Sequence, residues 1–414
     1  MKILFVVPYV PNFVRVRPFN MIRALSKRGH EVTVLTLWVN EEERQDVEQL
    51  RAHCHEVYAL PMSRWRSLWN CVLALPGRNP LQSVYSWQQG LATSLVDLTD
   101  FDVIHVEHLR GSRYGLHFKT HTGLPVVWDS VDSITHLFRQ AAVQSTDLLR
   151  RWRSKFELGR TEWYEGWLVS QFDHVLVTSP TDREVLLSLD GNGRHAPVSV
   201  VPNGVDLDYF VPDTAVSREP ATLIISGKMS YHANITMTMH MVQDIMPLVW
   251  QSRPDVKLMI VGKDPTSEIE ALAENPNIVV TGTVDHLPPY LQRATIAVVP
   301  IAYNAGIQNK VLEALACATP VITSPQAVAH LPLEPDRDLL VAGDAPSFAQ
   351  HILNLLADPV RQQQLGRTGR AYVERYHNWN HVAVRLEEIY TAVQPASVSA
   401  IETAVIPQVP QPVS

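Results

Sequence analysis

The strongest chemical signal in the chain is a predicted helix start that carries a cation and, one turn further on, a carboxylate. Asn309, Lys310 and Glu313 follow an apolar strand-like segment and the glycine Gly306. We expect Asn309 to be the helix N-cap. The first turn of a helix has unpaired N–H groups and partial positive charge, so it binds phosphate readily. Lys310 adds a full charge, and Glu313 is placed to accept hydrogen bonds from vicinal hydroxyls. An ordinary helix start with a solvated lysine has the same composition.

A second signal follows the predicted strand 221–226, where Gly227 and Lys228 precede a helical segment. Lys228 is predicted to neutralise a diphosphate, and His232 or Asn234 to supply another contact. The alternative is an ordinary loop between a strand and a helix, with an exposed lysine and Asn234 as the N-cap.

A third, weaker signal is the segment from Gly282 to Val284. It comes at the end of a predicted strand, where main-chain groups could face a planar base. A plain turn would have the same sequence.

The elements that must position these residues form two α/β halves. Lys2–Val7 is a short apolar run that predicts a buried strand. A helix over 19–28 and a strand over 31–37 follow, which predicts a parallel sheet with a right-handed crossover. Further strands are expected at 103–106, 125–128, 174–178, 198–201, 221–226, 256–261, 278–281, 296–300 and 320–323. Ligands of such sheets bind beyond the carboxyl ends of the strands.

Composition narrows the class of protein. The chain has 414 residues and a formal net charge of −7, so a nucleic-acid partner is disfavoured. The three cysteines, Cys54, Cys71 and Cys317, are widely spaced and odd in number, which is typical of reduced thiols in a cytoplasmic protein. We expect no metal site and no membrane-spanning segment.

At the phrases Gly306–Ile322, Val201–Asp206 and Arg28–Val34 the chain resembles the retaining GT-B glycosyltransferases of family 4. Within that family it is most similar to the sugar transferases of exopolysaccharide gene clusters. The resemblance implies two Rossmann-like domains that face each other across a cleft. We expect an acceptor domain at 1–205, a linker at 206–220, a donor domain at 221–378, a helix at 379–393 that crosses back, and a disordered tail at 394–414.

The resemblance also assigns roles to residues of the second domain. Glu313 is expected to hold the donor ribose, Lys228 and Lys310 to face the diphosphate, and Gly282 to Val284 to lie beside the base. The predicted donor site contains Arg17, Lys228, His232, Asn234, Gly282, Val284, Gly306, Ile307, Gln308, Asn309, Lys310, Val311 and Glu313.

Two positions depart from the family pattern. Relatives often carry a first glutamate with seven residues between it and the second, and that position is Ala305 here. Backbone N–H groups from Gly306 to Gln308 are expected to contact the sugar instead. The N-terminal loop lacks its usual glycines, and Arg15 or Arg17 is expected to reach the diphosphate.

The first domain is expected to hold the acceptor through Glu107, His108 and Asp132. Asp129 falls near the place where several relatives have a catalytic histidine, so Asp129 and Lys228 are the predicted catalytic residues. A capping pair of aspartates is the alternative for Asp129 and Asp132. We expect Lys228, Lys310 and the helix start to stabilise the leaving diphosphate, so that no metal or other cofactor is required. The resemblance to retaining enzymes implies that the departing phosphate itself takes the acceptor proton.

Two stretches rich in arginine and tryptophan, Arg64–Trp69 and Arg150–Lys155, suit a membrane surface at headgroup level. They would place the protein in the cytoplasm at the inner face of the membrane. A helix with a solvated basic face and a buried aromatic face would have the same composition.

The sequence therefore predicts a glycosyltransferase that moves a sugar, as a hexosyltransferase, from a UDP- or GDP-sugar to an acceptor hydroxyl in polysaccharide biosynthesis. A nucleotide-sugar epimerase and a catalytically silent binding protein are the alternatives. An NAD-dependent oxidoreductase is disfavoured, because no GxGxxG opens a helix after a strand.

Overall fold

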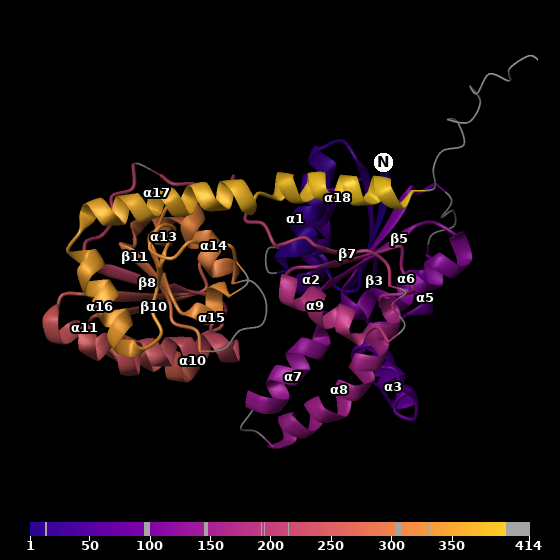
Figure 1. Cartoon of the computed structure of the whole chain (residues 1–414), viewed down its shortest axis with the longest axis horizontal. Coiled ribbons are helices and arrows are strands. Elements are labelled where there is room, and N and C mark those ends of the chain that lie inside the picture. Colours follow the sequence, from indigo (N-terminus) through magenta and orange to yellow (C-terminus); the bar gives the residue numbers. More distant parts are fainter. Residues whose placement is uncertain are drawn as a thin grey trace, which may run out of the picture.

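The chain folds into two α/β domains joined by short segments (Figure 1). The computed structural model describes residues 1–12, 15–94, 100–144, 148–191, 193, 195–213, 215–302, 308–329 and 331–394, and only the backbone within 140–155. The two doubly wound parallel sheets that the strand–helix alternation predicts are confirmed.

The N-terminal sheet has seven parallel strands in the order β3-β2-β1-β4-β5-β6-β7. The strands are β1 (Lys2–Val7), β2 (Glu31–Trp38), β3 (Glu56–Pro61), β4 (Val103–Glu107), β5 (Val126–Val131), β6 (His174–Val177) and β7 (Val198–Val200). Alternate residues of β1 enter two cores: Phe5 packs in the cluster that includes helix residue Tyr390, and Val6 packs in the cluster that includes Trp128. Both faces of the sheet are therefore covered, which explains the continuous apolar run.

Helices cover this sheet on both faces. They are α1 (Val16–Lys27), α2 (Glu41–Arg51), α3 (Arg64–Ala74), α4 (Leu81–Tyr85), α5 (Gln89–Ala92), α6 (His108–Thr122), α7 (Ile134–Gln144), α8 (Leu148–Leu168) and α9 (Pro180–Leu189). The antiparallel pair α7 and α8 projects from the lower side of the domain in Figure 1.

The C-terminal sheet has six parallel strands in the order β10-β9-β8-β11-β12-β13. They are β8 (Thr222–Ser226), β9 (Lys257–Val261), β10 (Ile278–Gly282), β11 (Ile296–Val299), β12 (Val321–Thr323) and β13 (Leu340–Val341). The helices are α10 (His232–His240), the π-helix η1 (Met241–Ile245), α11 (Met246–Ser252), α12 (Ser267–Glu270), the 3-10 helix η2 (Ala271–Glu274), α13 (Pro288–Arg293), α14 (Asn309–Ala316), α15 (Pro325–Val328), α16 (Ala345–Leu356), α17 (Pro359–Tyr376) and α18 (Trp379–Val393).

The last two helices join the domains. In Figure 1, α17 runs along the C-terminal domain and α18 continues across the N-terminal domain, where it packs against α1. The two connecting segments also touch: Val205 pairs with Asn378, and the Val205 N–H donates to the His377 carbonyl at 2.7 Å. A Cβ on Gly204 would come within 2.6 Å of the Trp379 ring, so the segments pass at a distance that only glycine allows.

Several element boundaries differ from those predicted. The helix predicted at 19–28 begins at Val16, because Pro18 is tolerated in a first helical turn. β5 continues past Trp128 to Val131. The strands β3 and β13 were not predicted, because Glu56–Pro61 is mostly half exposed and Leu340–Val341 has two residues.

Candidate functional site

A cavity of about 480 Å³ lies between the two domains. The first domain and the connecting segment contribute Val16, Asn20, Gly204, Val205, Asp206, Tyr209 and Phe210, and the second contributes Gly227, Lys228, Val261, Gly262, Lys263, Thr283, Val284, Asp285, His286, Leu287, Asn309 and Glu313. In the second domain these residues follow the carboxyl ends of β8, β9 and β10 or begin α14. The cavity therefore lies where doubly wound sheets bind ligands.

Two glycines that directly follow neighbouring strands leave the main chain of this cavity wall uncovered by side chains. Gly227 follows β8 with φ +148° and Gly262 follows β9 with φ +152°. A Cβ on Gly262 would lie 1.7 Å from the Gly227 carbonyl oxygen, so no other residue fits there without moving the backbone. A ligand in the cavity can thus approach main-chain atoms directly.

Lys228 projects into the cavity beside a second lysine, Lys263. The Lys228 Nζ lies 3.3 Å from the Asp264 carboxylate, and both side chains are about half exposed. An ion pair of this exposure contributes little to stability. Lys228 can therefore exchange Asp264 for an anionic ligand at small cost.

Lys310 is held by side chains of its own domain. Its Nζ donates to Asn234 Oδ1 at 2.7 Å and to Gln308 Oε1 at 3.0 Å. Asn234 also donates from Nδ2 to the Lys228 carbonyl at 2.9 Å, so this amide links the two predicted phosphate-facing segments. Burial lowers the pKa of Lys310 to about 8, and the nearby Glu313 opposes that shift.

Glu313 lies one turn into α14 and lines the cavity with Asn309. Burial raises the pKa of the Glu313 carboxyl to about 7, against the opposing charge of Lys310. The predicted N-cap is wrong by one residue: the N-cap is Gln308, and Asn309 is the first helical residue. Among the described residues no side chain caps this helix end, and the Val311 N–H is taken by the Gln308 carbonyl, which leaves the N–H groups of Asn309 and Lys310 for a ligand.

The other predicted donor residues have varied surroundings. Val284 lines the cavity, and Gly282 ends β10 two residues before it with φ +67°. His232 is the first residue of α10. Val311 is buried in the hydrophobic core, and its N–H donates to the Gln308 carbonyl at 3.0 Å. Gly306, Ile307 and the departing position Ala305 lie outside the described residues.

Sequence reasoning missed several cavity residues. Lys263 follows β9 directly after Gly262, and this glycine–lysine pair repeats the one at Gly227, so the repeat was a usable signal. Tyr209 belongs to the predicted linker and His286 to the second domain, and the Tyr209 hydroxyl lies 3.5 Å from His286 Nδ1. No local pattern marks these two, because only the domain arrangement brings them together.

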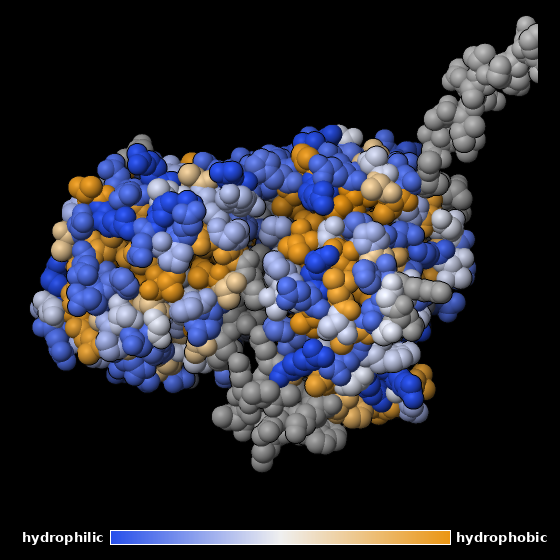
Figure 2. Space-filling model, viewed as in Figure 1, coloured by the Kyte–Doolittle hydropathy of each residue, from blue (hydrophilic) through white to orange (hydrophobic). Residues whose placement is uncertain are grey.

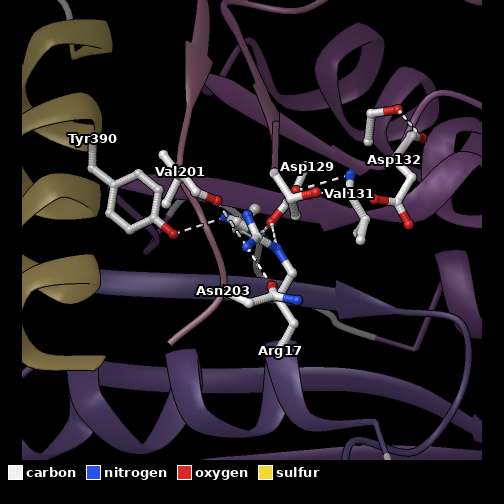
Figure 3. A network of polar contacts seen from close by, with 10 residues as sticks. Arg17, Asp129, Val131, Asp132, Val201, Asn203 and Tyr390 are labelled. Carbon is white, nitrogen blue, oxygen red and sulfur yellow. Dashed lines mark hydrogen bonds and ion pairs between the residues drawn. The ribbon is translucent and has the colours of Figure 1, made fainter. Parts of the chain in front are cut away.

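On the first domain, Arg17 and Asp129 form a buried ion pair (Figure 3). Arg17 Nε donates to Asp129 Oδ2 at 2.8 Å, and Arg17 Nη1 donates to the Val201 carbonyl and to Asn203 Oδ1. Asp129 Oδ1 accepts from the Val131 N–H at 3.0 Å. Arg17 therefore ties α1 to β5 and to the segment that leads into the cavity.

Arg17, a predicted donor residue, is not among the described residues that line the cavity. Arg17 Nη2 is buried and has no hydrogen-bond partner among the described residues. Arg17 lies on α1 between Val16 and Asn20, which both line the cavity. Arg15, the other predicted arginine, donates to Glu43 at 2.7 Å and to the Val10 carbonyl at 3.2 Å.

The crossing helix α18 reaches the same network. Its Tyr390 hydroxyl lies 2.8 Å from His105 Nδ1 and points toward the network in Figure 3. His105 Nε2 lies 3.7 Å from Asp129 Oδ2, and burial lowers the pKa of His105 to about 4. The last helix thus contacts the surroundings of the predicted catalytic carboxylate.

The acceptor candidates Glu107 and His108 sit where β4 passes into α6. Glu107 is the β4 residue paired with Asp129 on β5, and its Oε2 is buried with no hydrogen-bond partner among the described residues. Burial, with the Asp129 charge, raises the pKa of Glu107 to about 8. His108 has φ +62°, a left-handed conformation that is uncommon outside glycine. Backbone strain of this kind clusters at functional sites.

Asp132, the third acceptor candidate, faces another group. Its Oδ1 accepts from the Thr178 hydroxyl at 2.9 Å, and burial beside the Asp182 charge raises its pKa. In Figure 3 it lies beyond Asp129 as seen from Arg17. The structure therefore brings Glu107 and Asp129 together, with Asp132 bonded to the neighbouring strand end.

Two family models match the chain, one on each domain. Residues 14–209 match the model described as Glycosyltransferase Family 4. Residues 220–358 match the model described as Glycosyl transferases group 1. The boundary between the two matches falls in the predicted linker.

Within the aligned segments, about a quarter to a third of the residues are identical between this chain and its curated relatives. A GDP-mannose-dependent monoacylated alpha-(1-6)-phosphatidylinositol monomannoside mannosyltransferase of Corynebacterium glutamicum is 30% identical over 217 residues, which is 48% of this chain and 57% of that protein. An alpha-maltose-1-phosphate synthase of Mycolicibacterium smegmatis is 28% identical over 289 residues, 60% of this chain and 71% of that protein. The matches thus span from just over half to seven tenths of these two relatives.

Solved structures share the fold over nearly the whole chain. A sucrose-phosphate synthase from Thermosynechococcus elongatus superposes with a TM-score of 0.64 at 18% identity, over 95% of this chain and 98% of that one. Anabaena HepE, in complex with UDP and glucose, superposes with a TM-score of 0.67 at 13% identity, over 95% and 100%. Each of the two domains thus matches a glycosyltransferase family model, and the chain as a whole has the GT-B fold.

Proposed function

We propose that this protein transfers a sugar from a nucleoside diphosphate sugar to an acceptor hydroxyl, with retention at the anomeric carbon. The observation that carries the proposal is the cavity between the domains. Its wall combines Lys228, the α14 N-terminus and Glu313 within one space of about 480 Å³. These groups match the charges and hydroxyls of a nucleoside diphosphate.

The diphosphate is assigned to the space between Lys228, Lys310 and the first turn of α14. Two ammonium groups and unpaired helix N–H groups there would stabilise the negative charge that develops on the leaving group. An anion beside Lys310 also favours the charged form of a group whose pKa burial has lowered to about 8. This set of cations is the basis for proposing that no metal ion is needed.

The ribose is assigned to Glu313 and the base to the segment Gly282–Val284. Glu313 offers two acceptor oxygens to vicinal hydroxyls, and Val284 lines the same cavity. One relative is named as GDP-mannose-dependent, and one structural neighbour was solved with UDP. Both bases therefore belong in the first binding screen.

The acceptor is assigned to the first domain, beside Glu107 and His108. The bond from the anomeric carbon to the phosphate oxygen breaks, and a bond to the acceptor oxygen forms on the same face. The acceptor proton passes to the departing phosphate oxygen. Asp129 is fully buried and paired with Arg17, so we assign it an electrostatic role from behind the cavity wall and no direct contact with the acceptor.

We further propose that the acceptor is a glycan or glycolipid of polysaccharide synthesis in the cytoplasm. This proposal rests on the resemblance to exopolysaccharide sugar transferases and on relatives whose names include phosphatidylinositol mannosides. Because another relative is named alpha-maltose-1-phosphate synthase, small sugar phosphates are also tested as acceptors.

The test has two stages. Thermal unfolding is first followed with UDP, GDP, ADP and their sugars, because a ligand that binds the native state raises the melting temperature. The nucleotide that binds is then used to assay release of nucleoside diphosphate and to determine the product anomer by NMR, with and without EDTA. No shift with any nucleotide would refute the donor site. A shift without turnover on any acceptor would favour a silent binding protein, and loss of turnover in EDTA would refute metal independence.

A further inference from the structure

Helix α3 of the first domain exposes an apolar face to solvent and packs a polar face against the protein, which is the reverse of an ordinary surface helix. Its outward face carries Trp65, Leu68, Trp69, Val72 and Leu73, which follow a helical period. Trp65 is 76% exposed, Trp69 is 63% exposed and Leu73 is 74% exposed. Water-soluble helices place such side chains against the core, so this face calls for an explanation.

The inward face of α3 is polar. Ser67 is buried, and its hydroxyl donates to the Ser63 carbonyl. Asn70 Nδ2 donates to the Val84 carbonyl at 3.1 Å and to the Trp87 carbonyl at 2.9 Å. The two Asn70 bonds fix the helix on α4 and the segment after it, with the apolar face outward. The orientation is therefore built in by specific contacts.

Helix α8 extends the same surface. Arg160 donates to the carbonyls of Ala74, Leu75 and Asn79, which joins α8 to the end of α3. On the face of α8 that carries Arg160 lie Phe156, Trp163 and Trp167, all exposed. We call α3 together with these three side chains the apolar platform. Of the sixteen large apolar side chains exposed in the described part of the chain, nine belong to α3, its C-cap Leu75 or this face of α8.

The charge around the α3 part of the platform is positive, and on α8 Glu162 beside Trp163 is paired with Arg139 at 2.8 Å. From Val57 to Val96 the chain has three arginines, Arg64, Arg66 and Arg78, and no acidic residue. All three are exposed, and Arg64 and Arg66 flank Trp65. At 100° per residue, Arg64 and Arg66 lie on opposite sides of the apolar face of α3. The nearby Glu157 is buried and accepts from the Leu81 N–H at 2.9 Å.

We propose that the apolar platform docks on an anionic phospholipid bilayer, with α3 lying in the headgroup layer. Tryptophan and leucine side chains would enter the acyl boundary, and the flanking arginines would meet lipid phosphates. Charge decides for a lipid surface over a second copy of this chain, because two identical basic platforms would repel each other. Figure 2 shows apolar surface at the lower edge of the first domain, where Figure 1 places α3, with strongly hydrophilic residues beside it.

The platform is connected to the predicted acceptor side. α3 packs on α4, α4 packs on α6, and α6 begins at the acceptor candidate His108. No described helix is long and apolar enough to cross a bilayer. Docking through α3 would thus bring the acceptor half of the protein to the surface on which a lipid-linked substrate resides.

The test measures binding of the full chain to vesicles without any nucleotide, so its outcome is independent of the proposed activity. Vesicles of equal parts phosphatidylglycerol and phosphatidylcholine are compared with pure phosphatidylcholine by co-sedimentation. Trp65→Ser with Trp69→Ser should weaken binding about tenfold or more for each side chain. Arg64→Gln with Arg66→Gln should weaken it about fivefold per arginine and reduce its salt dependence. The matched control is Val360→Ser on α17, at a residue 77% exposed in the other domain, which should bind as the parent does.

Brominated lipids provide a second readout, because they should quench the tryptophan fluorescence of the parent more strongly than that of the double Trp variant, which keeps Trp163 and Trp167 of the platform. Thermal unfolding checks that each variant is folded. The proposal is overturned if the parent does not bind anionic vesicles, or if Val360→Ser lowers binding as much as the tryptophan changes. It is also overturned if sedimentation velocity shows that the platform instead holds two copies of the chain together.

Discussion

Binding of the nucleoside diphosphate should have a bell-shaped pH dependence set by Glu313 and Lys310. Glu313 must be ionised to accept from two ribose hydroxyls, and its pKa is raised to about 7. Affinity should therefore fall as pH decreases through 7; the ionised fraction of Glu313 drops about tenfold from pH 8 to pH 6, and the accompanying protonation of Lys310 reduces the net loss of affinity to about fivefold. Lys310 must be protonated to attract the diphosphate, and its pKa is lowered to about 8. Affinity should also fall as pH rises above 8, which places the optimum between pH 7 and 8.

Substitutions at Glu313 isolate the contribution of this residue to the pH dependence of nucleoside diphosphate binding. Glu313→Gln removes the titrating group and should abolish the fall between pH 8 and pH 6 that comes from the protein. Glu313→Ala removes both acceptors and should weaken binding by about 2 to 3 kcal/mol, roughly 30-fold to 150-fold. Glu270→Gln on α12 is the control, since this exposed residue does not line the cavity.

The assay is isothermal titration calorimetry of the preferred nucleoside diphosphate from pH 5.5 to pH 9.5, in buffers of different ionisation enthalpy. The ligand's own phosphate titrates in parent and variant alike, so the difference between the two profiles isolates Glu313. If Glu313→Gln keeps the slope and the affinity of the parent, the ribose does not contact this carboxylate. If affinity is unchanged above pH 8, Lys310 does not face the diphosphate.

Three further predictions test other parts of the structure. Lys228→Ala should slow turnover more than it weakens donor binding, and equal kcat for variant and parent would remove Lys228 from the catalytic set. Because the native pKa of Glu107 is raised to about 8, its contribution to stability is lost as pH rises from 4.5 to 8. Glu107→Gln should therefore flatten the fall in unfolding free energy over that range, which denaturant titration measures, by at most about 1.4 kcal/mol per pH unit. Gly262→Ala should lower stability by about 2 kcal/mol or more through its clash with the Gly227 carbonyl, whereas Gly343→Ala, with nothing within 4 Å of its Cβ, should not.

Local sequence was enough to predict the two sheets, and several of the residues it singled out line the cavity. Short apolar runs such as Lys2–Val7 are strands because both of their faces are buried, and this shows directly in composition. Gly227–Lys228 and the Lys310–Glu313 turn were visible for a similar reason. Each is a local transition from a strand or loop to a helix, where the backbone itself creates the binding groups.

Tertiary structure decided everything that depends on segments distant in the chain. The ion pair of Arg17 with Asp129 spans 112 positions, and Tyr390 meets His105 across 285 positions. The raised pKa of Glu107 and the lowered pKa of Lys310 arise from burial, which no spacing of residues reveals. The orientation of α3 was open as well, because the same tryptophans would suit a buried face. The bonds from Asn70 to the carbonyls of Val84 and Trp87 turn that helix outward, and only the folded chain contains them.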